Sequence, residues 1–202
     1  MPTEIIIFQI VVLIFSAVIH EYMHGWMADR LGDPTAKNAG RLTLNPIPHI
    51  DLFGSILLPV LLVVTGAGFV LGWAKPVPFN PYNLRDQKYG SAKVAVAGPL
   101  GNLITALFFG LILRFFPITS PQLILLLQII VFINLLLMIF NLVPIPPLDG
   151  SKVIMPFLPY QWQEKYMSIE RYGMFLVILF VIFGFSFIIP IISFLFGLIV
   201  GA

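Results

Sequence analysis

The chain has 202 residues, of which 59% are hydrophobic and only 10% are charged. Soluble domains carry about 25% charged residues, so this composition indicates an integral membrane protein, and a net charge of +2 without a basic patch excludes a nucleic-acid-binding surface. The absence of cysteine excludes disulfides and thiolate ligands, so a metal ion would have to be held by nitrogen and oxygen atoms.

Four apolar segments are long enough to cross a bilayer, which takes about 20 helical residues. They cover residues 5–27, 92–115, 122–144 and 172–200. The first segment is not expected to be a cleaved signal peptide, because Glu4 precedes it in place of basic residues and no small-residue cleavage site follows. We therefore predict an all-α, polytopic transmembrane helix bundle that forms a single domain over residues 1–202.

A fifth apolar segment, residues 52–73, is near the minimum length for a span and is interrupted by Pro59, Gly66 and Gly68. If it enters and leaves by the same face, Arg114 lies alone on one side and the other ten of the eleven basic residues lie opposite. Positive charge collects on the cytoplasmic side, so we predict four crossings, a re-entrant segment and an N-terminus outside. Irregular backbone at membrane depth needs protein or water around it, so the re-entrant segment is expected to line a cavity.

Two connecting segments carry turn-forming residues. Within residues 32–51, the stretch RLTL at 41–44 alternates polar and apolar residues, which predicts a short strand or hairpin at the membrane boundary. Residues 75–85 contain three prolines and are expected to form an extended loop.

The first span ends in VIHEYMHGW, residues 18–26. His20 and His24 are four residues apart and therefore share one face of a helix, where both imidazoles can hold one metal ion. Glu21 points beside that ion, as in the H-E-x-x-H pattern of zinc hydrolases, in which the glutamate takes a proton from a water that the metal activates. The alternative is a pair of core histidines bonded between helices with Glu21 as partner, but ionisable groups buried in a membrane are usually functional.

A catalytic zinc site needs a third protein ligand and one open position. The remaining candidates are His49, Asp51, Asp86, Asp149, Glu164 and Glu170. Asp149 lies in NLVPIPPLDG, directly after an apolar span, and the four-crossing arrangement places it at the same membrane face as His24. Two other interpretations stay open, namely Asp149 in a surface Asp-Gly turn and His49 with Asp51 as a pair that folds its loop.

Five short motifs follow one another along the chain. They are HEYMH at 20–24, GRLTLNPIPHIDLFG at 40–54, GWAKPVPFNPYNLR at 72–85, AGPLGN at 97–102 and NLVPIPPLDG at 141–150. Together they resemble the site-2 protease family of intramembrane zinc metalloproteases, in particular its compact prokaryotic members without a PDZ domain. The resemblance covers residues 18–155.

By this resemblance, His20, His24 and Asp149 would bind one zinc ion, and Glu21 would be the general base. Asn141 would hold substrate or stabilise the oxyanion, and a second interpretation makes it a helix C-cap.

Further residues are predicted to bind substrate with Asn141. Asn102 matches a polar position of the family motif. Gly40, Leu42 and Leu44 lie on an extended stretch that we expect to offer a strand edge to an unwound substrate.

The sequence thus predicts a zinc metalloendopeptidase of the cell membrane that cleaves a peptide bond in a transmembrane segment of another membrane protein. His20 lies about 22 Å along a helix from Ile5, so the zinc would lie inside a hydrocarbon core of about 30 Å, near its cytoplasmic face. The rival interpretations are a metal transporter or channel, and an inactive binding or chaperone-like relative. Both are disfavoured, because the polar groups cluster at one depth instead of following a path across the membrane, and because Glu21 is intact. The motifs specify neither the substrate nor the oligomeric state.

Overall fold

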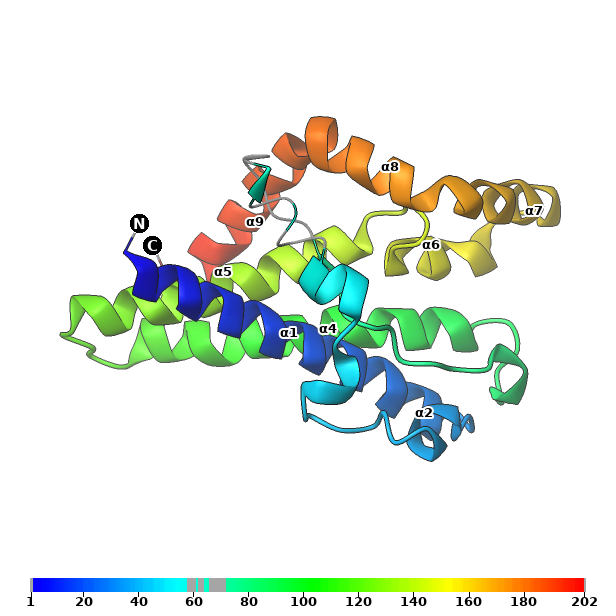
Figure 1. Cartoon of the computed structure of the whole chain (residues 1–202), viewed down its shortest axis with the longest axis horizontal. Helices are drawn as coiled ribbons and strands as arrows, with labels where there is room; N and C mark the ends of the chain where they lie inside the picture. Colours follow the sequence, from blue (N-terminus) through cyan, green and yellow to red (C-terminus); the bar gives the residue numbers. More distant parts are fainter. Residues whose placement is uncertain (1, 58–60, 62–63, 66–71, 202) are drawn as a thin grey trace.

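The computed structural model describes residues 2–57, 61, 64–65 and 72–201. In this part of the chain, four helical segments are long and apolar enough to cross a membrane. They are α1 (Thr3–Arg30), α4 (Gly90–Phe115), α5 (Pro121–Leu142) and the continuous segment Tyr160–Val200. The protein is a multi-pass membrane protein, and the predicted all-α polytopic bundle is confirmed (Figure 1).

The last segment is one bent helical run. It consists of α7 (Tyr160–Ile169), the 3-10 turn η5 (Glu170–Tyr172), α8 (Gly173–Leu179), the π-helical turn η6 (Phe180–Gly184) and α9 (Phe185–Val200). In Figure 1 it starts with α7 at one end of the bundle, bends between α8 and α9, and finishes at the opposite end. A π-helical turn is a common cause of such a bend, so the segment is one kinked helical run, long and apolar enough for a single crossing.

The helix directions place both chain termini at one end of the bundle. α1 and α5 run one way and α4 runs the other way, so the turn at 116–120 lies near the termini, whereas α2, α6 and α7 lie at the far end (Figure 1). Arg114 is at the end with the termini, where its Nη1 donates to the Leu198 carbonyl at 2.7 Å. The other ten of the eleven basic residues fall between the end of α1 and the first turn of α4, or between α5 and α8. This distribution is the one that four crossings require.

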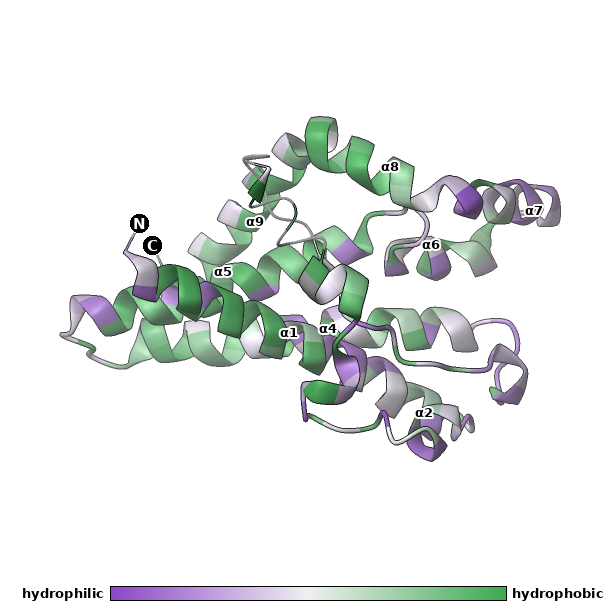
Figure 2. Cartoon of the chain, in the orientation of Figure 1, coloured by the Kyte–Doolittle hydropathy of each residue, from purple (hydrophilic) through white to green (hydrophobic). Residues whose placement is uncertain are grey.

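The core of the bundle lies between α4, α5 and α9. Its buried apolar residues are Ala106, Val131, Leu135, Met138, Ile188, Ile192 and Ile199. In the most apolar window of each of the four segments, only 17% to 39% is buried inside the protein, so most of the apolar surface faces outward. Figure 2 shows hydrophobic residues along the helices and hydrophilic residues mainly at the loops and helix ends. Lipid is therefore the expected neighbour of the outer faces.

α1 ends at Arg30, six residues after His24, in a Schellman motif that reverses the chain. The Asp33 N–H donates to the Ala28 carbonyl at 2.9 Å, and the Gly32 N–H donates to the Asp29 carbonyl at 3.1 Å. Gly32 has a φ of +106°, a left-handed conformation that glycine adopts without strain. The loops that follow α1 are thereby returned toward the site.

The described parts of the connections contain short helical elements. These are α2 (Thr35–Asn38), η1 (Ile47–His49), η2 (Leu52–Leu57), η3 (Pro81–Asn83), α6 (Asp149–Ile154) and η4 (Met155–Phe157). The predicted strand or hairpin at 41–44 is wrong, since no strand occurs among the described residues. A strand needs a second extended segment to form a ladder, and the Arg41 N–H instead donates to the Ala36 carbonyl at 2.9 Å.

The predicted re-entrant segment 52–73 is visible at its two ends. Its interior residues 58–60, 62–63 and 66–71 lie outside the described residues. The Trp73 N–H donates to the Gly54 carbonyl at 3.1 Å, and the Ser55 hydroxyl donates to the Trp73 carbonyl at 2.8 Å. The two ends therefore meet, which is the arrangement expected of a segment that enters and leaves by one face.

Candidate metal centre

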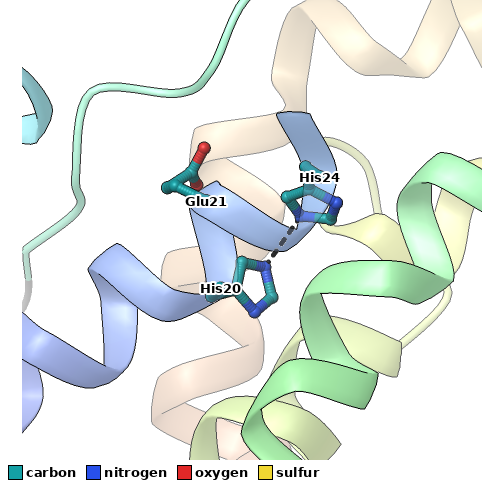
Figure 3. Close-up of side chains that lie close together, drawn as sticks. All are labelled: His20, Glu21 and His24. Atoms are coloured by element: carbon teal, nitrogen blue, oxygen red, sulfur yellow. Dashed lines mark hydrogen bonds between the residues drawn. The ribbon is translucent and has the colours of Figure 1, made fainter. Parts of the chain in front are cut away.

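Three side-chain atoms converge near the end of α1. The Nε2 atom of His20 lies 2.9 Å from the Nε2 atom of His24 and 2.9 Å from the Oδ2 atom of Asp149. His24 Nε2 lies 3.1 Å from the same carboxylate oxygen. Figure 3 shows the two imidazoles close together on one side of α1. Two imidazole nitrogens and one carboxylate oxygen are a common donor set of catalytic zinc sites with three protein ligands.

The outer nitrogen of each imidazole faces a hydrogen-bond acceptor. His24 Nδ1 lies 2.7 Å from the Val94 carbonyl oxygen, and His20 Nδ1 lies 2.7 Å from Asn102 Oδ1. Because these oxygens only accept, both Nδ1 atoms carry a proton, and the Nε2 atoms are the ones that can present lone pairs to a metal. Electron-rich atoms about 3 Å apart repel one another unless a cation or a proton lies among them. The donor atoms therefore fit a metal ion.

A buried polar network across three helices sets the orientation of the Asn102 amide. Asn102 Nδ2 donates to the Ser16 carbonyl and to Asn134 Oδ1, both at 3.0 Å, so Asn102 Oδ1 is left for His20. Asn134 Nδ2 donates in turn to the Ser16 hydroxyl and the Ile130 carbonyl, both at 2.9 Å. Both asparagines are fully buried. Such outer contacts hold a ligating histidine in one tautomer and one orientation.

Asp149 is the first residue of α6, and a close helix contact brings it to the histidines. A Cβ atom at Gly150 would lie 2.2 Å from the Leu142 carbonyl oxygen, so only glycine allows α6 to approach the end of α5 this closely. The Lys152 ammonium lies 3.9 Å from Asp149 Oδ1. The second oxygen, Oδ2, is the one that meets both histidines.

Glu21 lies beside the imidazole pair. One oxygen of its carboxylate and one nitrogen from each of His20 and His24 all lie within 4.8 Å of one another, a group that could hold a metal ion. In Figure 3 the Glu21 side chain leaves α1 in a different direction from the two imidazoles, from a neighbouring face of the helix. Its Oε2 atom accepts a hydrogen bond from the Val77 N–H at 2.7 Å. The carboxylate is thus held next to the donor atoms, where it can reach a water between them and a substrate.

A cavity of about 150 Å³ opens over these groups. It is lined by His20, Glu21, His24, Pro76, Val77, Phe79, Val94, Ala95, Asn141, Pro147, Leu148, Asp149 and Lys152. Asn141 lies in the last turn of α5, where its Nδ2 donates to the Leu137 carbonyl at 3.0 Å, and the C-cap position is occupied by Val143. Its second amide hydrogen and its Oδ1 atom have no bonded partner among the described residues, so they are available to a group in the cavity.

Other predicted substrate-binding residues lie elsewhere. Gly40, Leu42 and Leu44 are not among the residues that line the cavity, and Leu44 is exposed. Asn102 is buried behind His20, so its contacts favour holding the imidazole over touching a substrate.

Of the candidate third ligands, Asp149 is the one that meets the histidines in the described part of the chain. His49 is buried, and its Nε2 atom lies 3.0 Å from the Thr43 carbonyl oxygen. Asp51 Oδ1 accepts from the Gly54 N–H at 2.6 Å. Each of these two residues folds its own loop.

The sequence motifs did not single out three contributors to the site, namely Asn134, Gly98 and Val77. Asn134 had a signal, because an amide inside an apolar span needs a polar partner. Gly98 belongs to the AGPLGN motif, and a Cβ atom there would lie 2.4 Å from His24 Nε2. Val77 had no signal, because it contacts Glu21 through its backbone.

The fold and the site thus define a multi-pass membrane protein with a candidate metal centre of two histidines and one aspartate, flanked by a glutamate. Over 198 residues the chain is 37% identical to a protein of Bacillus subtilis, a match that covers 94% of this chain and 84% of the relative. It is 29% identical over 170 residues to a protein of Mycolicibacterium smegmatis, covering 84% of this chain and 64% of the relative. It is 30% identical over 180 residues to a protein of Methanocaldococcus jannaschii, covering 84% of each.

These three relatives carry the name "Putative zinc metalloprotease", followed by YwhC, Rip2 and MJ0611 respectively. No protein-family model matches the chain, and no solved structure matches it. The chain belongs to the zinc metalloprotease family of these relatives.

Proposed function

We propose that the protein is an intramembrane zinc endopeptidase of the site-2 protease type, which hydrolyses a peptide bond within or near a transmembrane segment of another membrane protein. The observation that carries this proposal is the meeting of His20 Nε2, His24 Nε2 and Asp149 Oδ2 within 3.1 Å, with Glu21 beside them. This group lies among helices that are long and apolar enough to cross a membrane. The family of the chain and the resemblance of its motifs support the same activity.

In this proposal His20, His24 and Asp149 hold one zinc ion. When bound, zinc supplies Lewis-acid activation of a water molecule and of the scissile carbonyl group. The chain supplies the ligand geometry, because Asn102 and the Val94 carbonyl orient the two imidazoles. Glu21 accepts the proton of the attacking water and later delivers it to the leaving amine.

Asn141 is the proposed electrophilic partner of the substrate. One of its amide hydrogens is engaged by the Leu137 carbonyl, which fixes the side chain toward the cavity. The other can donate to the carbonyl oxygen of the scissile bond as negative charge develops there, a contact of the oxyanion-hole type.

A peptide bond inside a helix is shielded, so the substrate has to unwind before it reaches Glu21. In hydrocarbon this leaves backbone groups without partners, at several kcal/mol each, unless the enzyme replaces them. Because Pro76, Val77 and Phe79 line the cavity and the stretch 40–46 does not, we place the unwound substrate beside residues 76–79. Replacing Gly, Asn or Pro near the scissile bond with Leu should then slow cleavage severely.

The test is a cleavage assay with the detergent-solubilised protein and a membrane-protein substrate, together with the zinc content per chain. Wild type should bind one zinc and cleave. Glu21→Gln should keep the zinc and lose on the order of 100- to 10,000-fold in rate, because the base is removed and the ligands stay. His24→Ala should lose both the zinc and the cleavage activity. Normal cleavage by Glu21→Gln would contradict the proposal. Zinc uptake into proteoliposomes without cleavage would also contradict it and would favour a transporter.

We further propose that the site lies near the cytoplasmic face and that the N-terminus is outside. A chain without cysteine accepts single reporter cysteines on a silent background. Cysteines at the exposed positions Tyr82 and Gln161 should be labelled from the cytoplasm, and one at Ser120 from outside. Labelling of Tyr82 and Gln161 from opposite sides would contradict the four-crossing arrangement.

A further inference from the structure

Arg41 is a buried cation that lacks an acidic partner. Only 8% of the residue is exposed, and its Nε atom has no hydrogen-bond partner among the described residues. No carboxylate lies within ion-pair distance of it in the described part of the chain, and the undescribed residues between 58 and 71 include no Asp or Glu. Burying an uncompensated charge costs several kcal/mol, so Arg41 is expected to have a role other than stabilising the fold.

The guanidinium of Arg41 is bonded to two successive carbonyl groups. Its Nη2 donates to the Lys75 carbonyl at 2.7 Å and lies 3.5 Å from the Pro76 carbonyl. The Pro76 carbonyl and the Val77 N–H belong to one planar trans peptide group, in which the two point in opposite directions. Val77 N–H is the group that donates to Glu21 Oε2 at 2.7 Å.

One peptide group therefore stands between a buried cation and the proposed general base. Arg41 faces its oxygen and Glu21 faces its hydrogen, which is the alignment in which the peptide dipole is favourable to both charges. Through this peptide group, the negative charge of the Glu21 carboxylate partly compensates the positive charge of Arg41.

Other contacts restrict how this peptide group can turn. The Lys75 N–H donates to the His49 carbonyl at 2.8 Å, and Val77 itself is buried. A Cβ atom on Gly25 would lie 3.0 Å from Val77 Cγ1, so the segment packs directly on α1. Arg41 is the side chain that donates hydrogen bonds to the two carbonyl groups before Val77, those of Lys75 and Pro76.

We propose that Arg41 is a positioning residue of the active site, whose guanidinium holds the Pro76–Val77 peptide group so that the Val77 N–H fixes the Glu21 carboxylate beside the metal ligands. The catalytic consequence rests on the proposed role of Glu21 as base. The geometric part of the inference does not depend on it.

The geometric part is tested by the NMR signal of the Val77 backbone amide, recorded with and without zinc. A hydrogen bond to a carboxylate moves an amide proton downfield. In Arg41→Met the Val77 proton should shift upfield, toward its position in Glu21→Gln, whereas in Ser55→Ala, which loses one tether of the same segment at Trp73, it should stay near wild type. An unchanged Val77 signal in Arg41→Met overturns the inference.

The catalytic part is tested by kcat, KM and zinc content. Arg41→Met should keep one zinc per chain and an unchanged KM, and lose on the order of 100-fold in kcat, because a base displaced by about 1 Å costs that much. Arg41→Lys keeps the charge but cannot bind both carbonyl groups, so its kcat should lie between those of wild type and Arg41→Met. If Arg41→Met does not fold, the kcat of Arg41→Lys provides the test. A kcat equal to that of Ser55→Ala, or loss of zinc in step with kcat, contradicts the positioning role.

These readouts separate the two proposals. If wild type cleaves no substrate, the proposed function fails while the Val77 signal still reports on Arg41. If wild type cleaves and the Val77 signal ignores Arg41, the positioning inference alone fails.

Discussion

Two neighbouring faces of α1, here called its imidazole side and its loop side, hold the parts of the candidate site in different ways. On the imidazole side, His20 and His24 are bonded to α4, through Asn102 and the Val94 carbonyl. On the loop side, Glu21 is bonded to Val77 in a segment without regular secondary structure. Metal ligands that rest on packed helices keep their geometry while a loop moves. The glutamate can therefore be displaced without disturbing the ligands, and each side can be altered separately.

The loop side has an anchor of its own in Asp33. Its buried carboxylate accepts from the Asn80 N–H at 2.6 Å and from Asn83 Nδ2 at 2.9 Å, and it also caps the turn at Thr35. Segment 72–85 is thus tied to the end of α1 at a point remote from the imidazoles. A change at Asp33 is expected to affect the Glu21 side first.

The largest effect is expected from Gly98→Ala on the imidazole side. A Cβ atom at position 98 would lie 2.4 Å from His24 Nε2 and 2.6 Å from His20 Nε2. Neither ring can move away freely, because the Nδ1 atom of each is hydrogen-bonded to α4. Stoichiometric zinc should be lost while the helical circular dichroism is kept. The matched control is Gly101→Ala, where the new atom would meet the flexible Met23 side chain at 2.6 Å and zinc should remain. Full zinc content in Gly98→Ala would show that the metal is not held between these imidazoles.

A smaller effect on the same side is expected from Asn102→Leu. This change removes the acceptor of the His20 Nδ1–H, so zinc affinity measured by chelator competition should fall about 10- to 100-fold. Asn134→Leu breaks the same buried network but keeps the contact between Asn102 and His20. It should lower the unfolding temperature with little change in zinc affinity. Equal losses of affinity in the two variants would mean that the network acts as a whole and not through the imidazole.

The smallest effect is expected from Asp33→Asn on the loop side. Burial alone would raise the pKa of the Asp33 carboxyl, but hydrogen bonds from Thr35, Asn83 and Asn80 outweigh it and hold the pKa below its usual range. The group therefore adds stability above its unfolded pKa of about 4, and this stability is lost as the pH falls through the lower folded pKa. At pH 7 the variant should be less stable by about 1–3 kcal/mol, and the difference should shrink below about pH 4.

The zinc content of Asp33→Asn shows whether Asp33 acts on the loop side of α1 or on the metal ligands. Asp33→Asn should retain zinc at pH 7 and lose part of its kcat. If it loses zinc instead, the two sides of α1 are coupled and the contrast between them is incorrect.

Much of this fold could be predicted because its signals are local. The span predicted at 122–144 is α5 at Pro121–Leu142, since a continuous apolar run of that length has few alternatives. The shared face of His20 and His24 follows from helix periodicity alone. The strand at 41–44 was wrong because a local alternation cannot show whether a second strand is available.

The amino-acid sequence alone determined the four apolar spans and the pairing of the two histidines, because each depends on residues close together in the chain. Only the tertiary structure decided which atoms complete the site. Asp149 lies 129 residues from His20, and Val77 lies 56 residues from Glu21, where it acts through a backbone N–H that every residue type except proline possesses. Contacts of this kind depend on how α4, α6 and the 72–80 segment pack against α1, and no residue pattern along the chain specifies that packing.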